Sequence, residues 1–512
     1  MADIISINPA TLEELGRFEP TSAQKVKEYA SKARSAGPSW ARLSFKERAG
    51  YLLRAREYIL NNIDDIARTI TRDNGKPLAE SVSAEILPAC DLIWWGAHSV
   101  AETLGPRRLT LGIFNLLLRR SIISYQPLGV IGIISPWNYP FSIPVGAAVM
   151  ALLAGNTVIL KTSSVTPLVG KIISDMFASV GLPESVFTHI VGGSETGENL
   201  LDCRLDKLVF TGSVAVGQHV AEVCARKLVP VTLELGGKDS SIVCADADIE
   251  TASSGVVWGA LTNSGQCCAS IERCYVHSSI AGKFIDRVVE KTKRLRVGNG
   301  EDPNIDLGPM TTFQQLQTVE AHVEDARSRG AKIECGGKRI EPGYFFEPTV
   351  ITGVDHTFAC VNCETFGPTL PIMTYDDDQQ AVQLANDSQY GLNAYIWTKD
   401  IKAGRKMAVK LRAGTVQIND SVYTHAISQT PWGGLKRSGF GRTHGAWGFF
   451  ELTSLHHTHI NYLTWLKDFW WYPYNKRLVS TLKSLSKTLT GGIMDKTCAL
   501  IGIIRALFYK KN

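Results

Sequence analysis

Five short apolar runs in the middle of the chain constrain the fold more than any other feature. They read VIGIIS from residue 130, NTVILK from 156, VFTHIV from 186, KLVFTG from 207 and VPVTLE from 229. Each run is nearly continuous in apolar, often β-branched residues, which is typical of strands buried on both faces of a sheet. Because stretches with helical character separate the runs, the sequence predicts an α/β fold built on a parallel sheet.

The rest of the chain extends this organisation in both directions. At 512 residues it is too long for one core, since single cores stop growing near about 250 to 300 residues. A second α/β region is expected from about residue 238 to 452, with strands at SSIVCA and ERCYVH and a helix after Asp248. The first hundred residues are expected to be helical, with helix starts at Thr21 in TSAQ and Ser44 in SFKE, which match the capping box.

Charge and cysteine content limit the function classes. The net charge of +5 comes from the tail, where residues 454–512 hold nine Lys or Arg against two Asp or Glu. The rest of the sequence shows no basic patch, so no nucleic-acid role is expected. The start lacks a basic segment followed by an apolar run, and the eleven cysteines are an odd number. We therefore expect a cytoplasmic protein with free thiols.

Two segments carry the residue types of a ligand site. VFTGSVAVG, residues 209–217, predicts a strand, a glycine turn and a helix start, where backbone N–H groups and the helix dipole favour a phosphate. Its spacing matches neither the usual dinucleotide fingerprint nor a P-loop, so an ordinary strand-to-helix turn is an equal alternative. Glu234 ends VTLE before a glycine pair, at the edge where open α/β sheets bind ligands. Its carboxylate is either a general base or a cap on a neighbouring helix.

The adjacent cysteines in NSGQCCAS, residues 263–270, are a third candidate. A cysteine is a good nucleophile where a helix N-terminus or a positive charge lowers its pKa and keeps it ionised. Buried structural cysteines are commoner. Position alone does not choose between Cys267 and Cys268.

Five motifs, in order and spacing, resemble the signatures of the aldehyde dehydrogenase superfamily: PWNYP from residue 136, LELGGK from 233, GQCC from 265, ETFGP from 364 and PWGGLKRSG from 431. The resemblance covers roughly residues 8 to 452. It implies a Rossmann-like cofactor domain in residues 1–107 and 128–236, and an α/β catalytic domain in residues 237–452. It also implies a small β oligomerisation flap in residues 108–127, an apolar segment expected to pair with another segment or subunit.

The resemblance assigns catalytic roles as well. Cys268, the second residue after the Gln of GQCC, would be the nucleophile, and Glu234 would be the general base. Asn138 of PWNYP would donate its amide to the oxyanion. These roles imply oxidation of an aldehyde to a carboxylic acid through a thiohemiacetal and a thioester on the cysteine. A CoA-acylating enzyme and a non-catalytic binding scaffold stay open as alternatives.

The cofactor that the resemblance implies is NAD or NADP. Its contacts are assigned to Trp137, Lys161, Gly212, Ser213, Gly217, Glu364 and Phe366. Ser164 stands where NAD-preferring members have a glutamate, which would repel the 2′-phosphate of NADP. We therefore expect the enzyme to accept NADP as a cofactor. No metal site is expected, because Cys360 and Cys363 form a single CxxC. The HHTH segment, residues 456–459, is interpreted as a solvated linker.

The extension of residues 453–512 needs a separate interpretation. WLKDFWWYPYNKRL mixes Trp and Tyr with basic residues, and a stripe at helical spacing follows, formed by Leu478, Leu482, Leu485 and Leu489. The end, GIMDKTCALIGIIRALFYKKN, is apolar but too charged to span a membrane comfortably. We expect residues 460–512 either to lie at a membrane interface or to pack on the protein or a partner subunit of a homodimer or homotetramer. Membrane contact would favour a hydrophobic aldehyde.

Overall fold

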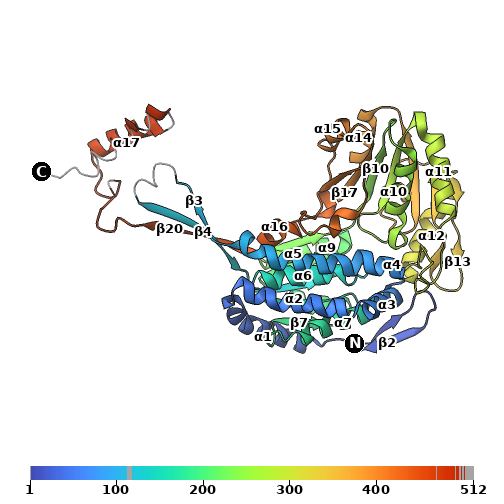
Figure 1. The fold of residues 1–512 in the computed structure, drawn as a ribbon, viewed down its shortest axis with the longest axis horizontal. Helices are drawn as coiled ribbons and strands as arrows, with labels where there is room; N and C mark the ends of the chain where they lie inside the picture. The colour runs from blue at the N-terminus through green and yellow to red at the C-terminus, as the bar shows by residue number, and fades with distance from the viewer. Residues whose placement is uncertain are drawn as a thin grey trace. The chain divides into compact units, whose positions relative to one another are not determined.

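The computed structural model of the protein describes residues 2–111, 118–468, 470–489, 492–494, 497, 498 and 501. The chain divides into two compact units. The larger unit comprises residues 1–104 and 126–454, and the smaller unit comprises residues 105–125 and 455–512. Figure 1 shows the elements of each.

A six-stranded sheet forms the first half of the larger unit, with strand order β19-β9-β8-β5-β6-β7. Its strands are β5 (Val130–Ile134), β6 (Thr157–Lys161), β7 (Phe187–Ile190), β8 (Lys207–Thr211), β9 (Val231–Glu234) and β19 (Gly439–Phe440). Strands β5 to β9 coincide with the five apolar runs and pair in parallel, which confirms the predicted sheet. Every residue of β6 and β8 is buried, as expected where helices cover both faces. The connecting helices are α6 (Ser142–Leu153), α7 (Pro167–Ser179), α8 (Ser194–Asp202) and α9 (Val214–Arg226).

A seven-stranded sheet forms the second half of this unit, with strand order β12-β15-β16-β11-β10-β17-β18. Its strands are β10 (Asp239–Val243), β11 (Ile271–His277), β12 (Lys332–Cys335), β15 (Thr349–Thr352), β16 (Thr369–Tyr375), β17 (Asn393–Trp397) and β18 (Thr415–Ile418). Neighbouring strands are parallel except β12 with β15. A small hairpin is formed by β13 (Arg339–Ile340) and β14 (Phe345–Phe346). Strands β10 and β11 confirm the predictions at SSIVCA and ERCYVH.

Helices complete the second half. They are α10 (Ile249–Leu261), α11 (Ala281–Lys293), α12 (Phe313–Ser328), α13 (Ala359–Asn362), α14 (Asp378–Asn386) and α15 (Ile401–Ala408). The later helix α16 (Gly445–Glu451) packs on α6 of the first half. The helix predicted after Asp248 is confirmed, because the Asp248 side chain accepts a hydrogen bond from Thr251 N at 3.0 Å and caps α10.

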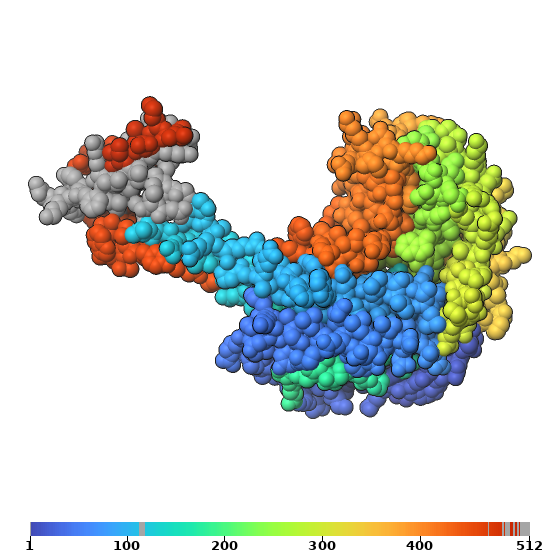
Figure 2. All heavy atoms as spheres, viewed as in Figure 1, coloured from blue at the N-terminus to red at the C-terminus, as the bar shows by residue number. Residues whose placement is uncertain are grey.

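The N-terminal segment forms helices that pack partly on the six-stranded sheet and partly on α6 and α7. These N-terminal helices are α1 (Ala23–Arg42), α2 (Phe45–Asn61), α3 (Ile63–Asn74), α4 (Leu78–Glu80) and α5 (Leu87–Leu104), and they make up much of the blue surface in Figure 2. A π-helical turn at Ser81–Ile86 joins α4 to α5. A short hairpin of β1 (Ile4–Ile7) and β2 (Glu14–Phe18), which was not expected, precedes the helices.

The two predicted helix starts have different outcomes. The capping box at Ser44 is confirmed, because Ser44 Oγ accepts from Glu47 N at 3.3 Å and Glu47 Oε2 accepts from Ser44 N at 2.7 Å. The start at Thr21 is wrong by one residue, because Ser22 is the N-cap of α1. The Thr21 hydroxyl instead accepts from Val191 N at 3.0 Å. A tertiary contact therefore decides which of two adjacent hydroxyl residues caps the helix.

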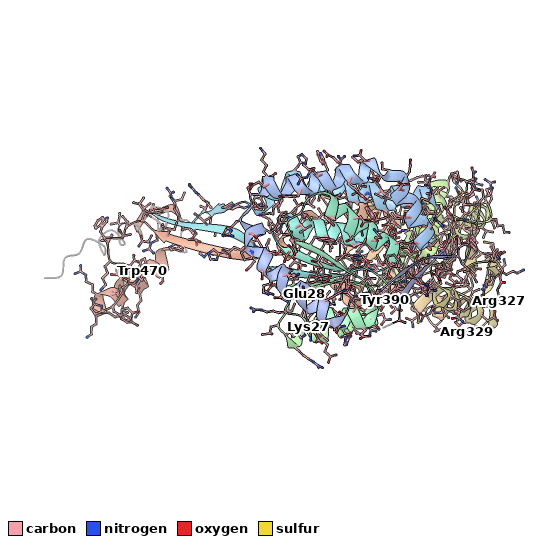
Figure 3. All side chains as sticks on the ribbon, turned by 90° about the horizontal axis from the view of Figure 1, so that it is seen from below. Lys27, Glu28, Arg327, Arg329, Tyr390 and Trp470 are labelled. Carbon is pink, nitrogen blue, oxygen red and sulfur yellow. The ribbon has the colours of Figure 1, made fainter. Side chains whose placement is uncertain are left out.

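The smaller unit contains a three-stranded sheet of order β20-β4-β3. Its strands are β3 (Arg107–Leu109), β4 (Arg119–Pro127) and β20 (Thr453–Asn461). The apolar segment after residue 107 thus pairs with a strand of the same chain, while residues 112–117 lie outside the described residues. The HHTH segment is exposed to solvent as expected, but it is not a linker, because it lies in β20, where Ser121 Oγ and His459 Nδ1 are 2.8 Å apart. Arg119 forms an ion pair with Asp468 and lies over the ring of Trp470, labelled in Figure 3.

The C-terminal extension contains the expected helix, α17 (Lys476–Leu489). Leu478 is buried and Leu482 is 38% exposed, whereas the side chains of Leu485 and Leu489 lie outside the described residues. Most of the apolar end after residue 492 also lies outside them. Among the residues that the structure describes, no helix is long and apolar enough to cross a membrane.

Candidate active site

The carboxyl edge of the six-stranded sheet gathers residues that lie far apart in the sequence. Trp137 and Asn138 follow β5, Gly212 follows β8, and Glu234 is the last residue of β9. The register pairs Thr211 with Glu234, and Gly212 N donates to Glu234 O at 3.1 Å. Because the carboxyl ends of parallel strands meet at one edge, these residues come together there.

An open cleft of about 240 Å³ lies at this edge. It is lined by Pro136, Trp137, Asn138, Thr211, Gly212, Ser213, Glu234, Leu235, Gly236, Cys268, Gln315, Thr318, Glu364 and Phe366. The lining thus includes the three residues predicted to be catalytic and most of those predicted to bind the cofactor. Thr211, Leu235, Gln315 and Thr318 were not expected there. Thr211 and Leu235 lie inside the quoted segments VFTGSVAVG and LELGGK, whereas no local motif marks Gln315 and Thr318.

Three predicted cofactor residues do not line this cleft. Lys161 is buried at the end of β6, where burial lowers the pKa of its ammonium to about 8. Ser164 is half-buried in the loop between β6 and α7. Gly217 packs on the segment after β9, where a Cβ atom would approach Leu235 Cδ2 to 2.4 Å. The small size of Gly217 therefore lets α9 lie close to the loop that follows Glu234.

A thiol and a buried carboxylate face each other in the cleft. Cys268 Sγ donates to Glu234 Oε1 at 3.8 Å. The indole of Trp432 also donates to Glu234 Oε1, so this carboxylate does not cap a helix as the alternative reading had it. Burial raises the pKa of Glu234 to about 7, and the hydrogen bonds from Trp432 and Cys268 oppose this rise. A group with that pKa can accept and return a proton near neutral pH.

The two cysteines have different surroundings. Cys268 is half-buried and lines the cleft, whereas Cys267 is buried and packs against Leu392 and Trp432. The hydrogen bond with Cys267, burial and the carboxylate of Glu234 raise the pKa of Cys268 well above its ordinary value. The Glu234 carboxylate is the acceptor in contact with the Cys268 thiol.

A glycine pair allows the loop after β9 to lie against both sides of the cleft. A Cβ atom at Gly236 would lie 2.3 Å from Glu364 Oε2, and one at Gly237 would lie 2.2 Å from Cys268 O. Gly237 N donates to Glu364 Oε1 at 2.9 Å. Burial and the charge of Glu272 raise the pKa of Glu364 to about 8. Because the two glycines have no side chains, the Glu364 carboxylate and the Cys268 carbonyl can both lie against the loop that follows β9.

The polar and aromatic groups around the thiol complete the site. Asn138 is buried, and its Nδ2 donates to Gln266 O at 3.1 Å, two residues before Cys268. The rings of Trp137 and Phe366 meet edge to face across the cleft, with centroids 5.6 Å apart. A thiol, an amide and a carboxylate thus lie together at the carboxyl edge of a parallel sheet, the edge at which open α/β folds bind ligands. These features define a class of nucleotide-dependent enzymes that act on a carbonyl group through a covalent cysteine.

Comparison with known proteins specifies the family. The model of the aldehyde dehydrogenase family matches residues 2–458, and the chain belongs to this family. It is an oxidoreductase that converts an aldehyde to the acid with NAD or NADP. The fold and the enzyme class predicted from the five motifs are therefore confirmed.

Individual relatives agree with this assignment. The chain is 38% identical to 4,4'-diapolycopene aldehyde oxidase from Methylomonas sp, over 93% of this chain and 89% of the relative. An NADP dependent enzyme of E. coli superimposes with a TM-score of 0.86 at 32% identity, covering 90% of this chain and 95% of that one. The NAD+ complex of an aldehyde dehydrogenase from Bacillus cereus gives a TM-score of 0.86 at 30% identity, covering 90% and 94%.

Proposed function

We propose that this enzyme oxidises a hydrophobic aldehyde through a thioester on Cys268, which water activated by Glu234 then hydrolyses. The observation that carries the proposal is the contact of 3.8 Å between Cys268 Sγ and Glu234 Oε1 inside the cleft. Hydrolysis needs a base beside the acylated sulfur, and Glu234 is such a base. A CoA-acylating enzyme would need no base at this place, which makes it the weaker candidate.

The proposed residues act in sequence on one carbon atom. Glu234 accepts the Cys268 proton, and the thiolate attacks the aldehyde carbon. The Asn138 amide then donates to the oxyanion, a contribution worth about 2.7 to 4 kcal/mol in comparable sites. NAD or NADP, when bound, accepts the hydride that leaves this carbon. Glu234 then releases the Cys268 proton to solvent and takes a proton from water. The hydroxide attacks the thioester, and the carboxylic acid leaves while Glu234 returns its proton to the sulfur.

The residues present fit a dinucleotide cofactor. The N-terminus of α9, with Ser213 as its N-cap, opens to the cleft, and the first N–H groups of a helix suit a pyrophosphate. The Glu364 carboxylate can accept from a ribose hydroxyl, and Trp137 with Phe366 forms an aromatic wall. Ser164 offers a hydroxyl where a carboxylate would repel a 2′-phosphate, so we assign NADP as an accepted cofactor.

A second cavity supports a hydrophobic substrate. It is narrow, with a volume of about 30 Å³, and it shares Thr211 and Glu234 with the cleft. Its apolar wall comes from α6, β8 and the end of α16, with Ile143, Ala147, Met150, Val209 and Leu452 among its residues, and its polar wall includes His425, Arg442, His444 and Glu451. We assign the hydrocarbon chain of the aldehyde to this cavity, since apolar surface is stabilised by leaving water.

A panel of straight-chain aldehydes from two to sixteen carbons, assayed with NAD and with NADP, tests this function. We expect kcat/KM to rise with chain length, because each buried CH₂ group adds about 0.8 kcal/mol. CoA should not accelerate turnover. Ala147→Leu narrows the second cavity and should lower kcat/KM for long aldehydes while sparing short ones. Equal rates for all lengths would contradict the hydrophobic substrate, and dependence on CoA would contradict hydrolysis.

We also propose that the smaller unit carries the contacts with other molecules. The strands of residues 108–127, edged by β20, would form the oligomerisation surface of a homodimer or homotetramer. The extension of residues 460–512 would bind a membrane face in the cytoplasm. The exposed aromatic residues of the extension support this, since Trp465 is 75%, Tyr472 74% and Tyr474 63% exposed. The surplus of basic residues after residue 454 favours an anionic surface.

Vesicle sedimentation tests the membrane contact. The full chain should sediment with vesicles that contain phosphatidylserine, less so at high salt, and should stay in solution with phosphatidylcholine alone. A full-length variant with Trp465→Ser, Tyr472→Ser and Tyr474→Ser should stay in solution with both and retain its activity on soluble aldehydes. Sedimentation of this variant with anionic vesicles to the same extent as the parent would contradict the proposal.

A further inference from the structure

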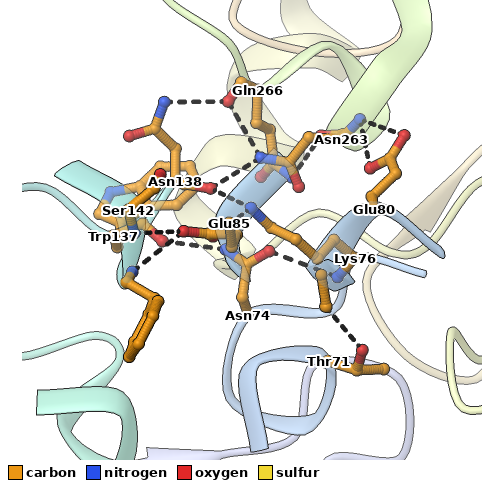
Figure 4. Close-up of polar contacts among 12 residues, drawn as sticks. Thr71, Asn74, Lys76, Glu80, Glu85, Trp137, Asn138, Ser142, Asn263 and Gln266 are labelled. Carbon is orange, nitrogen blue, oxygen red and sulfur yellow. Dashed lines mark hydrogen bonds and ion pairs between the residues drawn. The ribbon is translucent and has the colours of Figure 1, made fainter. Parts of the chain in front are cut away.

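Residues 74–85, between α3 and α5, bring a buried ion pair beneath the loop that carries Asn138 (Figure 4). Lys76 Nζ and Glu85 Oε1 are 2.6 Å apart, and both side chains are 0% exposed. The cost of removing two charges from water makes such a pair weak support for stability. The contacts of the pair point to another role.

Both charged groups bind the loop between β5 and α6. Lys76 Nζ donates to Asn138 O at 2.8 Å and lies 4.0 Å from the centroid of the Tyr139 ring. Glu85 Oε2 accepts from two backbone N–H groups at the start of α6, at 2.8 and 3.1 Å. The ammonium thus holds the middle of the loop, and the carboxylate holds its end.

The same segment holds the backbone that precedes the nucleophile. Glu80 accepts from Asn263 N at 2.8 Å. Asn263 Nδ2 donates to Asn138 O at 2.9 Å and to Gln266 O at 3.1 Å, and Asn138 Nδ2 donates to the same Gln266 O. One connected set of hydrogen bonds therefore joins the loop of Asn138 to the turn that leads into Cys268.

We propose that Lys76 and Glu85 are positioning residues for aldehyde oxidation, and that their ion pair sets the place of the Asn138 amide relative to Cys268. The inference rests on the proposed role of Asn138 as oxyanion donor. Neither charged group reaches the cleft, so both act through the loop. A displacement of about 1 Å in a catalytic group can cost on the order of 100-fold in rate, which gives this support a measurable effect.

A double-mutant cycle in the full-length enzyme tests the proposal. Lys76→Met with Glu85→Gln makes the pair neutral at similar size, and Asn138→Ala removes the amide that is positioned. The neutral pair should lower kcat by about 10- to 100-fold and leave the KM for NAD and NADP unchanged. In the Asn138→Ala background it should lower kcat no further, because the group it positions is absent.

A second buried pair provides a matched control. The side chains of Lys238 and Glu272 are 1% and 2% exposed. Glu272 accepts from Thr365 N at 2.7 Å and Phe366 N at 2.9 Å, so this pair holds the loop on the cofactor side. Lys238→Met with Glu272→Gln should raise the KM for the cofactor, and its effect should add in full to that of Asn138→Ala.

The outcomes separate this inference from the function on which it rests. If the fall in kcat of the Lys76 and Glu85 variant adds to the fall in kcat of Asn138→Ala, the positioning role is wrong and the proposed function is unaffected. A full rate in Asn138→Ala itself would overturn the oxyanion role and the inference together. If the methionine variant does not fold, Lys76→Gln with Glu85→Gln enters the same cycle. The glutamine amide at position 76 can still donate to the Asn138 carbonyl, so this variant should lose less kcat than the methionine variant. In the Asn138→Ala background it should lower kcat no further.

Discussion

Replacing Cys268 by alanine is expected to abolish aldehyde oxidation, lowering the rate on the order of 10⁴-fold or more, because no thioester forms without its sulfur. The sulfur lines the cleft and contacts the Glu234 carboxylate. Steady-state formation of the reduced cofactor measures the loss. Mass spectrometry of the intact protein during turnover should find an acyl group on the parent enzyme and none on Cys268→Ala.

Cys267→Ala is the matched control, since it removes the neighbouring sulfur from a buried position. Cys267 is 5% exposed and does not line the cleft. The variant should retain most of the activity and still carry the acyl group. A dead Cys267→Ala enzyme with normal thermal unfolding, or an active Cys268→Ala enzyme, would reverse the assignment of the nucleophile.

The sequence was most informative where local pattern decides structure. The five apolar runs predicted β5 to β9 because a strand buried on both faces has a distinctive composition. The helix start at Ser44 was predicted because a capping box is a contact between residues three apart. The hairpin of β1 and β2 was missed, since two short strands with mixed exposure leave little periodicity. HHTH was misread because β20 is a strand only through pairing with β4, which is distant in sequence.

The site shows the same division between local and distant contacts. Motifs selected residues that do line the cleft. PWNYP and LELGGK stand at the carboxyl ends of β5 and β9, while GQCC and ETFGP precede β11 and β16 of the seven-stranded sheet. They did not reveal that Trp432 donates to Glu234 from 198 residues away. They also did not indicate the surroundings of Cys268, whose pKa depends on groups from separate segments. Charge state is set by three-dimensional neighbours, so a pattern of residues could name the nucleophile but not its protonation.

Glu234→Gln should lower kcat by about 10²- to 10⁴-fold, since the base is lost while the shape is kept. The first turnover should still reduce cofactor, at a slower rate near neutral pH, because the Cys268 thiol loses its proton acceptor. The thioester should then persist, because no base activates water. Rapid mixing should show at most one reduced cofactor per active site, and mass spectrometry should show acyl enzyme accumulating on Cys268. Full multiple turnover without accumulation would contradict the role of Glu234.

The pH dependence gives an independent check on the same carboxylate. The base works only when it is unprotonated, so kcat of the parent enzyme should rise with pH through about 7, the pKa of Glu234. Trp432→Phe removes a hydrogen bond that lowers this pKa, so its rising limb should move to higher pH. Glu234→Gln should lose the limb. If the limb persists there unchanged, it belongs to another group, of which Glu364 with a pKa of about 8 is the nearest candidate in the cleft.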